Sequence, residues 1–208
     1  MTETDLPFSP AAERNQQPIL DALRQVLPER GSALEVASGT GQHAVFLATG
    51  LPHWRWQPTD QDPAMLPVIA ARRAACGLPN LRAPLRLDVR ADVWPVEGPA
   101  FAEPFDAVFC ANMLHIAPWE ACGALMRGAA RHLTPAGILI TYGPYFEEGV
   151  APSEGNRRFD ASLRDTNPAW GLRRLQAVEN QAALAGLALH SRVPMPANNL
   201  LLVWARTA

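Results

Sequence analysis

The stretch ALEVASGTGQ, residues 33–42, joins an apolar run to a turn that holds two glycines. Residues 33–37 have the apolar character of a buried strand, and residues 42–48 have the pattern of a helix. Between them, the glycines of the sequence SGTG, residues 38–41, allow the backbone to turn tightly against a ligand. A strand, a glycine-rich turn and a helix in this order predict the first strand–helix unit of an open α/β sheet.

The rest of the chain continues this alternation. Apolar runs predict further strands at residues 54–58, 85–87, 105–110, 138–142, 187–193 and 200–205. Helical periodicity predicts helices at residues 18–27, 64–76, 119–132 and 172–185. The expected fold is α/β and doubly wound, with a mostly parallel, Rossmann-like seven-stranded sheet and an antiparallel C-terminal strand.

Length and composition narrow the class of protein. The 208 residues predict a single domain over residues 1–208, with a cover segment and helix at 1–30 and an inserted lid at 144–171. The formal net charge is −2 without a basic tract, so a nucleic-acid partner is not predicted. Neither a signal peptide nor an apolar run of membrane-spanning length is seen, so we expect no membrane partner and a cytoplasmic location.

Three further observations exclude kinds of chemistry. All 18 basic residues are arginine, which removes Schiff-base lysines and the P-loop lysine. The three cysteines fit no metal or disulfide spacing, and we expect mostly buried thiols. No metal site is predicted either, because the histidines outside the expected ligand site are scattered: His43, His53, His132 and His190.

Polar side chains follow successive predicted strands. Glu35 and the glycine turn end the first strand, Asp60 follows the second, Asp88 the third and Asn112 the fourth. Ligands of such sheets bind at the carboxyl ends of the strands, where these side chains converge. Asp60 alone could cap the next helix, and Asp88 alone could start a turn. Three acids at successive strand ends favour a binding role.

Two cofactors suit this turn. Gly39-x-Gly41-x-x-Ala44 matches the dinucleotide fingerprint, and Asp60 lies near the spacing expected for a ribose carboxylate. A pyrophosphate beside Glu35 would meet a like charge, at a cost of about 4 kcal/mol for a separation of ~4 Å and an effective dielectric of ~20. S-adenosylmethionine instead brings a sulfonium and an ammonium, which a carboxylate attracts. Glu35 therefore favours S-adenosylmethionine.

The motifs resemble those of class I S-adenosylmethionine-dependent methyltransferases along nearly the whole chain. They are LEVASGTGQ (34–42), WQPTDQDP (56–63), RLDV (86–89), FDAVFCANMLHI (105–116) and LTPAGILITYGPY (133–145). The segments SPAAERNQQPIL, ANMLHIAPW, FDASLRDTNPAWG and MPANNL are similar more closely to the methyltransferase-like protein 26 family. Ala37 and Ala136 depart from the pattern, because each replaces a glycine that is common in these motifs.

The resemblance implies a set of cofactor-binding residues. Glu35 and Gly39 would face the methionine part, Asp60 the ribose, and Asp88 with Val89 the adenine. The full set is Asn15, Glu35, Ala37, Ser38, Gly39, Gly41, Asp60, Gln61, Asp88, Val89 and Asn112. S-adenosylhomocysteine would be the product.

Candidates for the chemistry lie after the fourth and fifth strands. His115 has the pKa class of a general base, and Tyr142 is a second catalytic candidate. The expected substrate-binding residues are Arg14, Tyr145, Trp170, Asn198 and Asn199. Arginines in or beside the insertion could clamp a carboxylate, although nearby acids favour a solvated surface of mixed charge: Arg157, Arg158, Arg164, Arg173 and Arg174.

The leading hypothesis is an enzyme that methylates oxygen, nitrogen or sulfur of a small, possibly aromatic, molecule. One alternative is an NAD(P)-dependent oxidoreductase that uses the same glycine turn. Another is a non-catalytic subunit that keeps the cofactor fold as a scaffold, to which Ala37 points. The sequence leaves the oligomeric state open.

Overall fold

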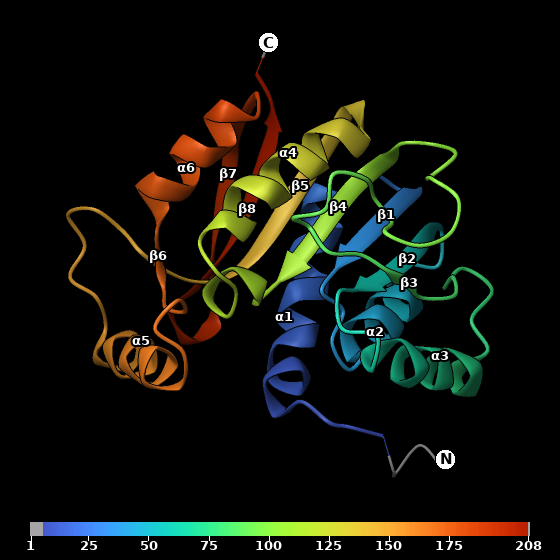
Figure 1. Ribbon diagram of the computed structural model, residues 1–208, viewed down its shortest axis with the longest axis horizontal. Helices are drawn as coiled ribbons and strands as arrows, with labels where there is room; N and C mark the ends of the chain where they lie inside the picture. Colours follow the sequence, from blue (N-terminus) through green and yellow to red (C-terminus); the bar gives the residue numbers. More distant parts are fainter. Residues whose placement is uncertain (1–5, 208) are drawn as a thin grey trace. The chain divides into compact units, whose positions relative to one another are not determined.

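In a computed structural model that describes residues 6–207, helices and strands alternate along the chain as predicted (Figure 1). Residues 1–5 and 208, the outermost parts of the predicted cover segment and domain, lie outside the described residues. The chain divides after Phe109 into two units. The predicted single domain over residues 1–208 stays a prediction.

The first unit holds a parallel group of strands. Its strands are β1 (Gly31–Val36), β2 (Trp54–Asp60), β3 (Leu85–Arg86) and β4 (Phe105–Ala111), and β4 ends in the second unit. Their order is β3-β2-β1-β4, and β2 pairs in parallel with both β1 and β3. Asp106, the charged residue of β4, accepts hydrogen bonds from the backbone and hydroxyl of Ser32. The three acids at the ends of β1, β2 and β3 therefore belong to one unit.

Helix α1 (Pro10–Val26) begins earlier than residues 18–27, where the sequence predicted it. The side chain of Ser9 accepts a hydrogen bond from the Ala12 amide, and Pro10 occupies the first turn, where a proline costs no hydrogen bond. Pro18 therefore lies inside the helix rather than at its start. Arg14, expected just before the helix, lies within it.

The remaining helices of the first unit are α2 (Gln42–Gly50) and α3 (Met65–Cys76), close to their predicted bounds. Helix α2 contacts β2 and both of the other helices. The C-cap of α3 is Gly77 with a left-handed backbone, as predicted. Below the helices, the Trp56 and Phe109 rings lie 6.0 Å apart in the core.

The second unit is built on antiparallel strands. Its strands are β5 (Leu133–Phe146), β6 (Arg173–Arg174), β7 (Leu187–Met195) and β8 (Asn199–Arg206). Strand β8 pairs antiparallel with β5 and β7, which confirms the predicted antiparallel C-terminal strand. Within residues 6–207 the main path of the sheet has seven strands, as predicted, and the two-residue β6, which pairs with β5 off this path, was not predicted.

The predicted bounds of the fifth strand were wrong. Strand β5 extends at both ends beyond residues 138–142, and at its C-terminal end Pro144 stays paired opposite Asn199 despite its missing N–H. The predicted lid at 144–171 contains helix α5 (Glu154–Thr166), which Ser153 caps. The other helices are α4 (Glu120–His132), α6 (Leu175–Leu184) and the short η2 (Met113–His115) and η3 (Pro196–Asn198).

The fold is thus α/β, with a mostly parallel sheet that ends in an antiparallel strand. Cys110 and Cys122 are buried and Cys76 is half-buried, as expected for inert thiols. Within residues 6–207, none of the helices is both long and apolar enough to cross a membrane.

Gly41 provides a test of this packing. It has a φ of 77°, and a Cβ there would lie 3.3 Å from the backbone of Ile69 in α3. We expect Gly41→Ala to lower the free energy of unfolding by about 2–4 kcal/mol, since left-handed strain and overpacking add. Gly77→Ala is the control, because its φ is 62° but nothing lies within 4 Å of its Cβ position. Equal losses in urea denaturation would contradict the close approach of α2 to α3.

Candidate functional site

Glu35, near the end of β1, is a buried carboxyl group with a side chain only 2% exposed. The indole Nε1 of Trp56 on β2 donates a hydrogen bond to its Oε2. Burial raises the pKa of Glu35 to about 7, although hydrogen bonds from Trp56 and Ser38 oppose the shift. The carboxyl is therefore poised between its neutral and charged forms near neutral pH.

The glycine turn after β1 is fastened to the end of β2. The Ser38 amide donates to the Thr59 carbonyl at 2.8 Å, and the Thr59 amide donates to Ser38 Oγ at 3.2 Å. The next amide, of Gly39, donates to Asp60 Oδ2 at 2.8 Å. Gly39 has a φ of 54°, and nothing lies within 4 Å of its Cβ position. The turn is therefore held in place while its Gly39 face stays open to a ligand.

Asp60 has a structural role of its own. Besides Gly39, its carboxylate accepts the Asp62 amide at 2.9 Å through Oδ1. Burial raises the pKa of Asp60, while these two backbone hydrogen bonds lower it. It does not cap α3, whose N-cap Ala64 has no side-chain hydrogen bond. Each carboxylate oxygen can accept a further hydrogen bond, so Asp60 remains able to bind a hydroxyl group.

The predicted adenine-side residues have a different character. Asp88 starts a turn, as the simpler alternative held, with its oxygens bound by the backbone and guanidinium of Arg90. Partial burial alone would raise the pKa of Asp88, but the hydrogen bonds from Arg90 outweigh it and the pKa is lowered. Val89 beside it is buried, whereas Gln61 after β2 is exposed.

The segment before α1 is tied to the glycine turn by two side chains. Gln42 accepts the Ser9 amide at 2.6 Å, and Arg72 donates to the carbonyls of Thr40 at 2.9 Å and Pro7 at 2.6 Å. Farther along α1, the predicted cofactor residue Asn15 lies with Oδ1 2.7 Å from His43 Nε2. Arg14 beside it is exposed. The described part of the predicted cover segment therefore reaches the turn through Gln42 and Arg72.

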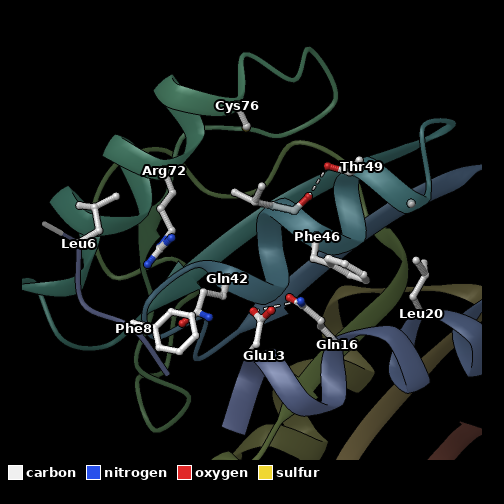
Figure 2. A pocket seen from close by; sticks show the side chains of 12 residues that line it. Leu6, Phe8, Glu13, Gln16, Leu20, Gln42, Phe46, Thr49, Arg72 and Cys76 are labelled. Carbon is white, nitrogen blue, oxygen red and sulfur yellow. Dashed lines mark hydrogen bonds between the residues drawn. The ribbon is translucent and has the colours of Figure 1, made fainter. Parts of the chain in front are cut away.

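A cavity of about 600 Å³ lies between this segment and the three helices of the first unit (Figure 2). Glu35, Gly39 and Asp60 are not among the residues that line it. Those residues are Leu6, Phe8, Glu13, Gln16, Leu20, Gln42, Val45, Phe46, Thr49, Gly50, Arg72 and Cys76. The cavity is therefore distinct from the group formed by Glu35, Gly39 and Asp60.

In the second unit, Asn112 and His115 lie against Gly143. Asn112 has a φ of 62°, and its amide donates to the Tyr142 carbonyl at 2.8 Å. A Cβ on residue 143 would lie 3.3 Å from His115 Nδ1 and 3.9 Å from Asn112 Oδ1. Only a glycine at 143 leaves this space to the imidazole and the amide.

His115 is buried, and its ring contacts the Phe159 ring of α5 edge-on at 5.4 Å. Burial, with the nearby charge of Arg173, lowers the pKa of His115 to about 4. The imidazole is therefore neutral at physiological pH. A general base works best with a pKa near the working pH, so in this environment His115 is a weak one.

The two tyrosines of β5 are buried. The Tyr145 hydroxyl donates to Thr141 Oγ1 at 3.1 Å, and burial raises its pKa above the ordinary value. Tyr145 nevertheless lines a second cavity, of about 430 Å³, together with the predicted substrate residues Asn198 and Asn199. Trp170, the remaining substrate candidate of this unit, is not among its lining residues.

Sequence reasoning missed several of these partners. Trp56 reads as an ordinary core residue, yet its indole holds Glu35. Arg173 donates to the carbonyls of Leu114 at 2.8 Å and Ala117 at 2.5 Å, so it supports the loop that carries His115. A lone arginine gives no sign of such backbone partners. Among residues 6–207, no group of three or more metal-ligating side chains is found.

Residues 6–206 match the model of a protein family described as "Protein of unknown function (DUF938)". The chain belongs to the DUF938 family. The match covers nearly all the residues that the structure describes in this DUF938 protein, both units included.

Several solved structures with a fold similar to that of the DUF938 protein are methyltransferases. Mitomycin 7-O-methyltransferase MmcR is 13% identical with a TM-score of 0.79, and the match covers 95% of this chain and 54% of that one. An O-methyltransferase family 2 protein from Planctomyces limnophilus in complex with apigenin is 18% identical, with a TM-score of 0.73 and coverages of 92% and 62%. CalO1, a methyltransferase in calicheamicin biosynthesis in its SAH-bound form, is 17% identical, with a TM-score of 0.70 and coverages of 93% and 54%.

The DUF938 chain thus spans little more than half the length of these proteins. The likeness shows that it has the Rossmann-like fold of S-adenosylmethionine-dependent methyltransferases, which confirms the predicted fold class.

Ala37 provides a test of the turn in the DUF938 protein. Its φ is 57°, a conformation that costs a residue other than glycine about 1–2 kcal/mol. We expect Ala37→Gly to leave the free energy of unfolding unchanged or to raise it by up to about 1 kcal/mol, because relief of strain offsets the added chain entropy. Ala33→Gly, at a buried position inside β1, should instead cost about 1–2 kcal/mol. Equal losses in the two variants would show that Ala37 is not strained.

Proposed function

We propose that this DUF938 protein is an enzyme that transfers a methyl group from S-adenosylmethionine to an oxygen, nitrogen or sulfur atom of a small molecule. The observation that carries the proposal is the buried carboxyl of Glu35 beside an open, glycine-containing turn that Asp60 fastens. The shared fold of the methyltransferases supports it.

Charge separates this cofactor from a dinucleotide. A cation near Glu35 favours the carboxylate and would draw its pKa down from about 7. A pyrophosphate would hold the carboxyl protonated or be repelled by it. The residues at the glycine turn, Glu35 among them, therefore fit a ligand that carries an ammonium and a sulfonium, and they disfavour the oxidoreductase alternative.

The proposed roles of the cofactor residues follow from their surroundings. Glu35 attracts the cationic part, the open face of Gly39 admits the ligand to the backbone, and Asp60 accepts hydrogen bonds from ribose hydroxyls. The remaining proposed cofactor residues are Asn15, Ala37, Ser38, Gly41, Gln61, Asp88, Val89 and Asn112. When bound, S-adenosylmethionine supplies the electrophilic methyl group.

On the acceptor side, the proposed residues act mainly by positioning. A neutral His115 accepts a hydrogen bond from the methyl acceptor, and because its low pKa makes it a weak base, the proton that an O–H or N–H acceptor loses on methylation passes to solvent. Holding reactants in a near-attack geometry alone can supply roughly 7–11 kcal/mol in favourable cases. Tyr142 is the second proposed catalytic residue. Arg14, Tyr145, Trp170, Asn198 and Asn199 are the proposed substrate residues.

The finer resemblance to the methyltransferase-like protein 26 family, the single domain over residues 1–208 and a cytoplasmic location are parts of the same proposal. The motifs quoted for that family lie in both units, which supports a common architecture.

Asp60 gives the direct test of the cofactor assignment. In calorimetric titration with S-adenosylhomocysteine, Asp60→Asn should weaken binding about 10- to 100-fold, because hydrogen bonds to a charged carboxylate are lost. Asp62→Asn is the matched control, since Asp62 is exposed and its carboxylate accepts the Ala64 amide. Unchanged affinity in folded Asp60→Asn would remove Asp60 from the site, and no binding by any variant would favour the scaffold alternative.

Glu35 also predicts a pH dependence of stability. Its pKa of about 7 in the folded chain lies above the ordinary value of 4.5, so the stability that the neutral carboxyl contributes is present below pH 4.5 and is lost as the pH rises through 7. At pH 8 this loss amounts to about 3 kcal/mol. Glu35→Gln, measured by urea denaturation without cofactor, should therefore be more stable than the wild type at pH 8 and similar to it at pH 4.5. A variant that is less stable at pH 8 would show that the carboxylate is not buried at a cost.

A further inference from the structure

The 430 Å³ cavity of the second unit lies between the end of β5, the start of α5 and the turn that joins β7 to β8. Its volume is within the usual range for a small-molecule site. Apolar and aromatic side chains make up much of the lining: Tyr145, Phe146, Val150, Ala151, Pro152, Pro194, Met195, Ala197 and Leu200. The character of its ligand is therefore decided by the few polar groups.

The charged groups of the cavity neutralise one another. Arg192 donates from Nε and Nη2 to the two carboxylate oxygens of Glu147, both at 2.7 Å. A bidentate pair of this kind occupies the face of the guanidinium that would otherwise bind a ligand carboxylate. The cavity thus presents no unpaired cation among the residues that line it.

The arginines of the insertion do not change this balance. Arg158 pairs with Glu154, Arg164 pairs with Asp160, and Arg173 binds backbone carbonyls. The described lining residues of the cavity include none of the five arginines in or beside the insertion. The pairs Arg158–Glu154 and Arg164–Asp160 form the surface of mixed charge that the sequence favoured over a carboxylate clamp.

Three asparagines supply the remaining polarity. Asn156 Nδ2 donates to the Asn198 carbonyl at 3.4 Å, and Asn199 Nδ2 donates to the Pro196 carbonyl at 2.9 Å. Beyond these two bonds, each asparagine side chain has an oxygen that can accept and at least one N–H that can donate. Amide oxygens accept hydrogen bonds, so they suit a ligand that brings O–H or N–H donors.

The backbone at this turn is unusual. Ala197 and Asn198 each have a φ of 58°, a conformation that residues other than glycine adopt at a cost. Consecutive strained residues persist only where the surrounding structure imposes them, and they gather at ligand sites. The strain fixes the position of Asn198 at the rim of the cavity.

We propose that this cavity binds a neutral aromatic molecule bearing hydroxyl or amide groups, and that it rejects carboxylates. A carboxylate would lose its hydration and find Arg192 already paired with Glu147, whereas the asparagine side chains offer a hydroxyl or amide group both acceptor oxygens and N–H donors. That this molecule is the methyl acceptor rests on the proposed function. Binding itself does not.

Two probes of matched shape test the preference: 4-hydroxybenzamide and 4-hydroxybenzoate. Binding is followed by NMR chemical-shift titration at pH 7.5, with and without S-adenosylhomocysteine. We expect the wild type to bind the amide at least tenfold more tightly than the carboxylate. Equal affinities, tighter binding of the carboxylate, or binding of neither probe would overturn the proposal.

The variant Glu147→Gln tests the ion pair through a gain of affinity for the carboxylate probe. Removing the partner's charge leaves Arg192 available, so the affinity for 4-hydroxybenzoate should rise at least tenfold. Glu148→Gln is the control, because this exposed neighbouring acid does not line the cavity. A rise in both variants, or in neither, would contradict the role given to the Glu147–Arg192 pair.

The variant Asn198→Gly tests the proposal without changing the Glu147–Arg192 ion pair. Glycine accepts a φ of 58° without strain, so the variant should fold at least as stably as the wild type. It should bind 4-hydroxybenzamide several-fold more weakly, and unchanged binding would exclude Asn198 from the site. Retained S-adenosylhomocysteine binding with loss of the probe preference would leave the proposed function standing while overturning this inference.

Discussion

The burial of one carboxyl group, that of Glu35, is an electrostatic constraint on the first unit. Glu35 lies buried near the end of β1, and hydrogen bonds from the Trp56 indole and from Ser38 in the adjoining turn offset its desolvation. A buried ionisable group that raises its own pKa to about 7 costs stability whenever it is charged. Perturbed ionisable groups of this kind cluster at functional sites, and in the proposed function a cationic ligand at the turn would use the charge.

In the proposed enzyme, the two units offer a ligand different electrostatic environments. The first keeps Glu35 ready to ionise beside a turn that backbone hydrogen bonds from Ser38 and Gly39 hold in place. The second pairs the charges of Arg192 and Glu147 within its cavity and leaves mostly amide oxygens for a ligand. In the proposed enzyme, the environment of the first unit suits a cationic cofactor, and that of the second unit suits a neutral methyl acceptor.

Much of the fold was predictable because local signals agreed. The apolar run and glycines around residue 39 predicted β1 and α2, and the C-cap Gly77 was expected from its position. The start of α1 was misplaced because Pro18 was taken as a helix start, although Ser9 and Pro10 form a complete N-terminal signal. Strand β6 has only two residues and depends on pairing with β5, so no pattern in the chain marks it.

The candidate site was predictable in kind but not in detail. Acids at successive strand ends could be placed by topology alone, whereas the raised pKa of Glu35 depends on how deeply β1 is buried. The turn at Asp88 was among the alternatives that the sequence offered, whereas the hydrogen bond between Trp56 and Glu35 depends on side-chain directions that residue types do not specify. The neutral cavity also escaped prediction, because Glu147 and Arg192 are far apart in the sequence.

The central claim is that Glu35 ionises to receive a cationic cofactor. Titration calorimetry with S-adenosylhomocysteine at pH 7, in two buffers of different ionisation enthalpy and with NADH as the comparison, tests it most directly. The account predicts that S-adenosylhomocysteine, through its ammonium group, binds with release of a fraction of a proton, because a carboxyl whose pKa is raised to about 7 is partly protonated before binding. It predicts that NADH does not bind. Binding of NADH alone, or binding of S-adenosylhomocysteine without proton release, would contradict it.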